Sequence, residues 1–171
     1  MLRILTILLI IFINFILQST LFQNIMIFGI TPNTAIIIIV AFAIMRQDIE
    51  GAIIGFFAGL LQDIFFGNVI GLNALIYMFI GFLSGKPFKE FYLENYILPI
   101  ALVGTSTILY NFIYYVINFL FRARLDFFTY LGIIILPETI YNIILTLPLY
   151  IVLYQINKLL EKRENEKRRM F

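Results

Sequence analysis

Six stretches of apolar residues follow one another along the chain, each bounded by charged residues, proline or glycine. A bilayer core about 30 Å thick is crossed by about 20 helical residues, so stretches of this kind predict transmembrane helices. The last two stretches are long and should tilt or kink, with Pro137 and Pro148 as the kink sites. We expect six spans, at residues 4–22, 32–45, 51–66, 72–85, 96–121 and 127–154.

The composition supports this interpretation, because 62% of the residues are apolar and only 13% are charged. Soluble domains average about 25% charged residues, so this chain has too few charges to cover a water-facing globule. The sequence therefore predicts an all-α, polytopic membrane protein, with a six-helix transmembrane domain at residues 1–154. Residues 155–171 form a basic cytoplasmic tail, which could rest on anionic lipid or dock a cytoplasmic protein.

The placement of Lys and Arg predicts the orientation of the chain. Six spans put both termini on the same side, and ten of the twelve basic residues then lie on that side. Cytoplasmic loops carry the excess of basic residues in membrane proteins, so we expect both termini in the cytoplasm. Only Arg122 and Arg124 fall on the outer side. The inner residues are Arg3, Arg46, Lys86, Lys89, Lys158, Lys162, Arg163, Lys167, Arg168 and Arg169.

The chain contains no His, Cys or Trp. Zinc sites built on His or Cys, thiol nucleophiles, disulfides and Ser–His triads are therefore excluded. Nucleic-acid binding would need a larger basic surface than this chain offers. We expect a protein that is not an enzyme and that holds no metal or cofactor.

The third and fourth spans carry the most specific pattern of small and polar residues. Residues four apart share one face of a helix, and small residues on such a face let a neighbouring helix approach closely. The pattern predicts a tight helical hairpin whose turn contains Gly67 and Gly71. The series in the third span is Gly51, Gly55, Gly59 and Asp63, beside Gln62, and the series in the fourth is Asn73, Tyr77, Gly81 and Gly85.

Asp63 has three possible roles. It could cap the turn by accepting hydrogen bonds from backbone N–H groups, contact a partner or ligand, or couple to a proton or ion. The nearest basic residues by topology are Arg122 and Arg124. We expect the glycine face and the Asp63 turn to fix the fold and to present an outer surface to a single-span partner.

Other polar residues lie within the predicted spans. Glu138 could be a neutral, hydrogen-bonded group inside the bundle or a contact in a central cavity. The remaining residues could make hydrogen bonds between helices or line a pocket. They are Asn14 and Gln18 in the first span, Asn111 in the fifth and Asn142 in the sixth.

The hairpin sequence at residues 51–63, followed by Gly67, Gly71, Asn73, Tyr77 and Gly81, resembles the signature of the MreD family of rod shape-determining membrane proteins. Residues 17–20 and 28–33 agree with the family in the same order. Pro137, Tyr141, Asn142 and Pro148 resemble its last helix. Asn33 stands where the family often has Asp, so this chain lacks a charge there.

The resemblance implies a non-enzymatic component of the bacterial elongation machinery in the cytoplasmic membrane. Its direct partner would be MreC, and through MreC it would act with MreB, RodA and a class B penicillin-binding protein in lateral peptidoglycan synthesis. Membrane lipids are the other expected contact.

The family is also similar in fold to the substrate-binding subunits of energy-coupling-factor vitamin and metal transporters, so such a subunit is the alternative function. Those subunits typically dock through an Ala-x-x-x-Ala face on the first helix, and the first span here contains no Ala. A membrane-embedded enzyme would need Asp63 and Glu138 to meet, although they lie on different helices.

Overall fold

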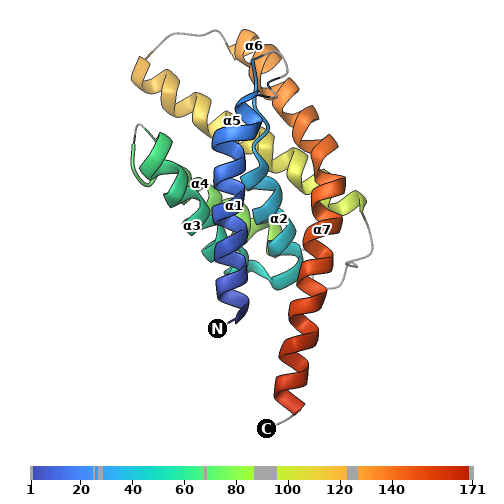
Figure 1. Cartoon of the computed structure of the whole chain (residues 1–171). Helices are drawn as coiled ribbons and strands as arrows, with labels where there is room; N and C mark the ends of the chain where they lie inside the picture. Colours follow the sequence, from blue (N-terminus) through green and yellow to red (C-terminus); the bar gives the residue numbers. More distant parts are fainter. Residues whose placement is uncertain are drawn as a thin grey trace.

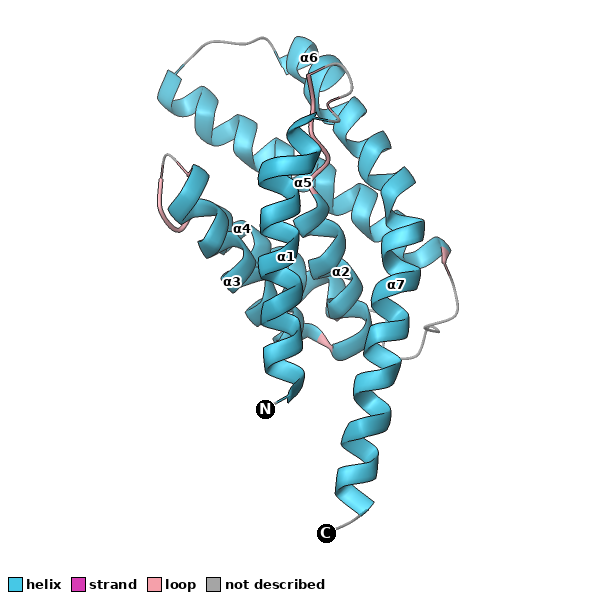
Figure 2. Ribbon diagram, in the orientation of Figure 1, coloured by secondary structure: helices cyan, strands magenta, loops and turns pink. Residues whose placement is uncertain are grey.

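A computed structural model describes residues 2–24, 26, 29–67, 69–86, 96–122 and 127–169. Helices account for nearly all of this part of the chain, and it contains no β-strand (Figure 1; Figure 2). The predicted all-α class is therefore confirmed for these residues. Of the residues used in the sequence argument, Phe28, Lys89 and Arg124 lie outside the described residues.

The elements are α1 (Leu2–Asn24), α2 (Thr34–Arg46), α3 (Asp48–Phe66), α4 (Leu72–Gly85), α5 (Ile97–Arg122), α6 (Phe127–Tyr130), the π-helix η1 (Leu131–Ile135) and α7 (Leu136–Arg169). The last three follow one another without a break, so the final helix continues well past residue 154 into the predicted basic tail. Strong helix formers make up most of this extension, and Asn157 donates a hydrogen bond to Glu161 one turn later.

Four helical stretches are long and apolar enough to cross a membrane: Arg3–Leu21, Asp48–Phe66, Ile97–Ile117 and Phe127–Arg163. The chain is therefore a membrane protein. The other two helices, α2 and α4, have 13 and 14 residues. At 1.5 Å per residue each is about 20 Å long, which is shorter than a bilayer core. The start of α1 and the end of α7 lie at the same end of the molecule (Figure 1).

Helix α2 is the centre of the bundle. It contacts α1, α3, α4, α5 and α7, and almost every residue from Thr34 to Met45 is buried. Ile36, Ile37 and Phe42, which lie on different sides of the helix, are 0% exposed. A helix that is apolar on all sides has no preferred solvent face and is stable where other helices or lipid surround it. The bundle thus encloses α2 and leaves the outer faces of its neighbours for the lipid.

Helices α3 and α4 form the predicted hairpin, and their contact is the most extensive between any two helices of the described part. A Cβ atom added to Gly51 would lie 2.8 Å from the carbonyl oxygen of Gly81, and one added to Gly55 would overlap the carbonyl group of Tyr77. The backbones therefore touch, and only glycine fits between them. Backbone atoms of α4 or of the α2–α3 junction are equally close at the remaining glycines of this face, Gly59 and Gly85.

The π-helix η1 ends two residues before Pro137, one of the two predicted kink sites. Proline has no N–H to donate, and its ring crowds the carbonyl group four residues earlier. The wider π-turn over Leu131–Ile135 gives this part of the backbone more room. Pro148, the second predicted kink site, lies inside α7.

The glycine contact leads to a test of stability. Gly55→Ala should destabilise the protein by roughly 1–3 kcal/mol or more, because the new methyl group meets backbone that cannot move aside. Gly132→Ala is the matched control, since a Cβ there meets nothing within 4 Å. Thermal unfolding of the detergent-solubilised variants, followed by size-exclusion chromatography, measures the difference. Equal midpoints for the two variants would contradict the close backbone contact.

Candidate functional site

Asp63 holds the start of α4. Its side chain is 1% exposed, and its Oδ2 atom accepts hydrogen bonds from the backbone N–H groups of Gly71 at 2.9 Å and Ala74 at 3.0 Å. Its Oδ1 atom accepts from the backbone N–H of Asn73 at 3.1 Å and from the Asn73 side chain at 2.9 Å. The first N–H groups of a helix have no partner within the helix, and a negative charge is favourable beside them. Of the three possible roles of Asp63, this is the geometry expected if it caps the turn by accepting backbone N–H hydrogen bonds.

The turn before α4 depends on glycine at one position. Gly71 has a φ of +98°, in the left-handed region that glycine adopts at least cost. Gly67 ends α3, and its N–H donates to the carbonyl oxygen of Asp63. Of the two arginines suggested as partners of Asp63, Arg124 lies outside the described residues, and no side chain is described for Arg122.

Asn73 also connects α4 to α5 by a hydrogen bond. Tyr110 of α5 donates its hydroxyl to the Oδ1 atom of Asn73 at 2.9 Å, so the carboxylate that caps α4 is linked through one amide to α5. The rings of Tyr77 and Tyr110 also contact each other, with centroids 5.4 Å apart. Tyr110 was not among the predicted site residues, although it directly precedes Asn111.

Tyr77 joins α4 to the start of α2 and the end of α3. The side-chain amide of Asn33 donates to the Tyr77 hydroxyl at 2.8 Å, and the hydroxyl lies 2.9 Å from Oε1 of Gln62. Because the hydroxyl has one hydrogen, the arrangement that satisfies all three groups has Asn33 donating to Tyr77 and Tyr77 donating to Gln62. Asn33 thus acts through its side-chain amide, which donates to Tyr77.

A second group of hydrogen bonds joins α2 to α1, α5 and α7. The backbone N–H of Asn33 donates to Oδ1 of Asn142 at 2.9 Å, and the Asn142 amide donates to Thr107 at 3.0 Å. Thr34 donates to Asn14 of α1 at 2.7 Å. Asn33 and Thr34, at the start of α2, are therefore hydrogen-bonded to α7 and to α1, the last and first helices of the chain.

Glu138 lies inside the bundle between α7 and α5. It is buried, and its Oε2 atom accepts a hydrogen bond of 3.0 Å from the Asn111 side chain. Asn111 donates as well to the carbonyl oxygen of Thr107. Glu138 and Asp63 have no hydrogen bond to each other, and each is used on a different pair of helices.

These contacts bring most of the sequence-predicted polar residues together inside the bundle, as three hydrogen-bonded groups that meet at adjacent residues of the chain, hereafter the polar network. Neighbouring helices share its members, so each hydrogen bond also fixes how one helix lies against the next. Four members were not among the candidate site residues: Asn33, Thr34, Thr107 and Tyr110. The network consists of Asn14, Asn33, Thr34, Gln62, Asp63, Asn73, Tyr77, Thr107, Tyr110, Asn111, Glu138 and Asn142.

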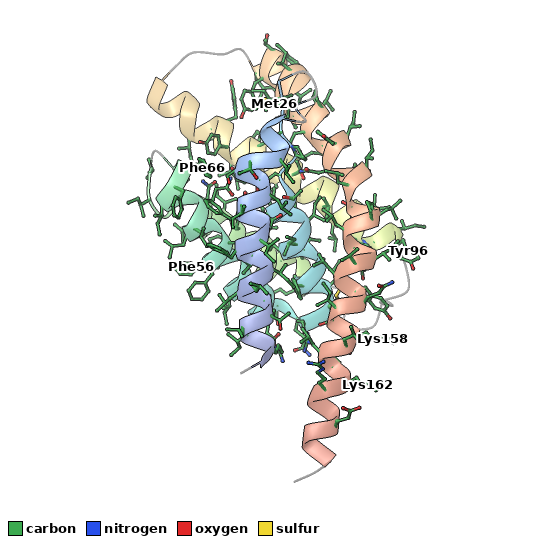
Figure 3. All side chains as sticks on the ribbon, viewed as in Figure 1. Met26, Phe56, Phe66, Tyr96, Lys158 and Lys162 are labelled. Atoms are coloured by element: carbon green, nitrogen blue, oxygen red, sulfur yellow. The ribbon has the colours of Figure 1, made fainter. Side chains whose placement is uncertain are left out.

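Gln18 lies apart from the network, beside a half-open cavity of about 190 Å³ at one end of the bundle. Figure 3 shows two members of its wall, Met26 and Phe66, at the opposite end of the molecule from Lys158 and Lys162. The cavity is lined by Phe15, Gln18, Met26, Thr31, Gln62 and Phe66. It lies beside the Asp63 turn, since Gln62 belongs to both.

At the other end of the bundle, charged and amide groups tie the helices together. Arg46, the last residue of α2, donates to Asn157 of α7, and Arg3 of α1 forms an ion pair with Glu50 of α3. Arg46 and Asn157 were not predicted as a pair. Among the described residues, no three His, Cys, Asp or Glu side chains come together as a metal site would require.

The Asp63 cap yields a second test. Asp63→Asn replaces one acceptor oxygen by an amide that cannot accept, beside N–H groups that have no other partner within α4. We expect a loss of about 2 kcal/mol, the range of hydrogen bonds to charged groups. The matched control is Asp48→Asn, which removes an acidic side chain from the first turn of α3 and should cost about 0.3–1 kcal/mol. A thermal midpoint for Asp63→Asn at or above that of Asp48→Asn would argue against the cap.

A model of the family described as rod shape-determining protein MreD matches residues 1–162 of the chain. No curated protein and no solved structure matches it significantly. The family match takes in every helix from α1 to the greater part of α7, including the hairpin, the Asp63 turn and the polar network. The chain therefore belongs to the MreD family of rod shape-determining proteins.

Proposed function

We propose that this chain is a non-enzymatic scaffold of the bacterial elongation machinery, which lies in the cytoplasmic membrane with six spans and binds MreC. Through MreC it would act with MreB, RodA and a class B penicillin-binding protein in lateral peptidoglycan synthesis. Membership of a rod shape-determining family gives the role in cell shape. The partner and the place in the machinery are the proposal.

The observation that supports a scaffold best is how the polar network uses its side chains. The two buried carboxylates of the spans, Asp63 and Glu138, accept hydrogen bonds from the chain itself, on different helices. An embedded enzyme would instead bring such groups together around a substrate. Here they fix the positions of helices, which is what a rigid docking partner needs.

We expect the partner surface to lie away from the glycine face of the hairpin. The glycine face of α3 is filled by α4, so a single-span partner cannot pack there without displacing α4. The end of the bundle beside the Asp63 turn is the better candidate, because its cavity is open and large apolar side chains are exposed there. Phe65, Phe66 and Ile70 are 65%, 55% and 74% exposed there.

Depletion of the protein in its host tests the proposal. Cells that lose it should become wider and round, and MreC should be recovered with an affinity-tagged copy of the chain. Microscopy measures cell width, and an immunoblot for MreC measures recovery. Unchanged shape, with an energy-coupling ATPase recovered in place of MreC, would support the transporter subunit and overturn the scaffold.

The proposed orientation has its own test, made simple by the absence of cysteine from the chain. In intact cells, an Ile70→Cys variant should react with a membrane-impermeant maleimide, because Ile70 is exposed and its turn faces outward in the proposed orientation. A Glu166→Cys variant, at the end of α7, should react only after the cells are opened. The reverse pattern, or equal labelling of the two thiols in intact cells, would contradict cytoplasmic termini.

A further inference from the structure

The cavity beside the Asp63 turn is lined by two kinds of side chain, an apolar set (the wall) and a polar set (the floor). Phe15 of α1, Phe66 of α3 and Met26 form an apolar wall, and Gln18, Thr31 and Gln62 supply polar groups. Phe15 and Phe66 contact each other, with ring centroids 5.5 Å apart. Met26 and Phe66 lie at the end of the bundle that holds this cavity (Figure 3). An occupant must therefore be apolar over most of its surface and polar at one point.

The hydrogen bonds of Gln62 define what it can offer to such an occupant. Its Oε1 atom is already the acceptor for the Tyr77 hydroxyl, which in turn accepts from Asn33. What remains of the Gln62 head group is its amide nitrogen, which carries two donors. The polar network thus orients Gln62 as a donor at the edge of the cavity.

Gln18 and Thr31 add the complementary capacity. Within the described part of the chain, neither side chain makes a hydrogen bond, although both are half-buried. Each can accept and donate. Both side chains can therefore bond to an occupant of the half-open cavity without giving up a bond to another described residue.

The size of the cavity limits the occupant to one ring. Its volume is about 190 Å³. A cavity of about 150 Å³ accommodates benzene, so there is space here for a single six-membered ring with small substituents. Aromatic and thioether groups in the wall favour a ring over an aliphatic chain.

We propose that this cavity binds a tyrosine side chain of the membrane partner, with the ring between Phe15, Met26 and Phe66 and the hydroxyl between Gln62 and Gln18. A phenol oxygen accepts from the Gln62 amide and donates to Gln18 or Thr31, so one group satisfies both kinds of polar partner. Tyrosine also suits a membrane interface, where one end of a side chain is apolar and the other wet. The partner rests on the proposed function and is MreC, whereas the preference for a phenol rests on the cavity alone.

Phenylalanine and lipid acyl chains fit the wall but not the floor. Either would leave the Gln62 amide and the Gln18 side chain without partners, and a site built for a hydroxyl rejects the analogue that lacks it. The matched small probes are p-cresol, which is the tyrosine side chain, and toluene, which is that of phenylalanine. They differ by the hydroxyl group only.

The first experiment uses a single reporter thiol in the cysteine-free chain. Met26→Cys places it on the cavity wall, and its rate of modification by a methanethiosulfonate reagent is measured with each probe present. We expect p-cresol to protect the thiol at a concentration roughly threefold to tenfold lower than toluene, as one or two hydrogen bonds would give. Thr105→Cys, an exposed position of α5 that does not line the cavity, reports any unspecific effect of the probes.

Variants of the polar lining residues distinguish binding of the probes in the cavity from their partition into the detergent. Adding Gln18→Leu or Gln62→Leu to the Met26→Cys chain should abolish the advantage of p-cresol, whereas Gln155→Leu, exposed on α7, should leave it unchanged. The Gln18→Leu chain should fold like the parent, because no hydrogen bond of the described structure is lost. Gln62→Leu leaves Tyr77 with Asn33. Equal protection by p-cresol and toluene in the parent, or an advantage that survives both Leu variants, would overturn the phenol site.

The second experiment tests whether the bound tyrosine ring belongs to MreC. MreC recovered with the Gln18→Leu and Gln62→Leu chains should fall severalfold below its recovery with the parent and with Gln155→Leu. If MreC is not recovered with the parent, the proposed function fails, and the comparison of p-cresol with toluene still decides the cavity. If recovery is the same for every variant, MreC binds elsewhere and the inference is wrong.

Discussion

The direct contact between the backbones of α3 and α4 is the constraint on which the rest of the structure depends. Because the glycines of α3 let the carbonyl groups of α4 come within touching distance, the two helices have a fixed register. That register brings Asp63 to the first N–H groups of α4 and Tyr77 to Gln62. Helix α2 packs against this pair and takes its orientation from Tyr77 through Asn33. A hairpin one residue out of register would lose the cap and the link to α2 together.

Lipid offers no hydrogen bonds, so the polar groups of a membrane bundle must satisfy one another. In this chain the same requirement aligns the helices. The amides of the polar network link neighbouring helices: Asn73 bonds to α5, Asn142 bonds to α5 and to the start of α2, and Asn111 bonds to Glu138 of α7. Helices that are apolar all round could slide or rotate with little change in free energy, and these few hydrogen bonds remove that freedom. The cavity lies where the network reaches the end of the bundle, at Gln62.

The helices and the hairpin could be predicted because apolar length and four-residue spacing are properties of the sequence itself. The capping geometry of Asp63 was one of three alternatives, and the choice needed the positions of Gly71 and Ala74 in space. The central place of α2 could not be predicted, since a helix with apolar residues on every side is equally suited to lipid and to protein. Tyr110 and Thr107 escaped notice for a similar reason: their partners, Asn73 and Asn142, lie at least 35 residues away along the chain. The continuation of α7 past residue 154 was obscured by its charges, which end an apolar stretch without ending a helix.

The burial of α2 has a consequence for how the protein is made. Helix α2 leaves the ribosome before the helices α3, α4, α5 and α7 that cover it, and the backbone of Asn33 receives its bond only when Asn142 has been synthesised. During translation this short helix must wait, with Asn33 and Thr34 at its start, beside lipid or the insertion machinery. The last segment to be made therefore completes the middle of the protein. A nascent chain cut short before α7 would reach the membrane with its core still open, which makes it a natural substrate for membrane quality control.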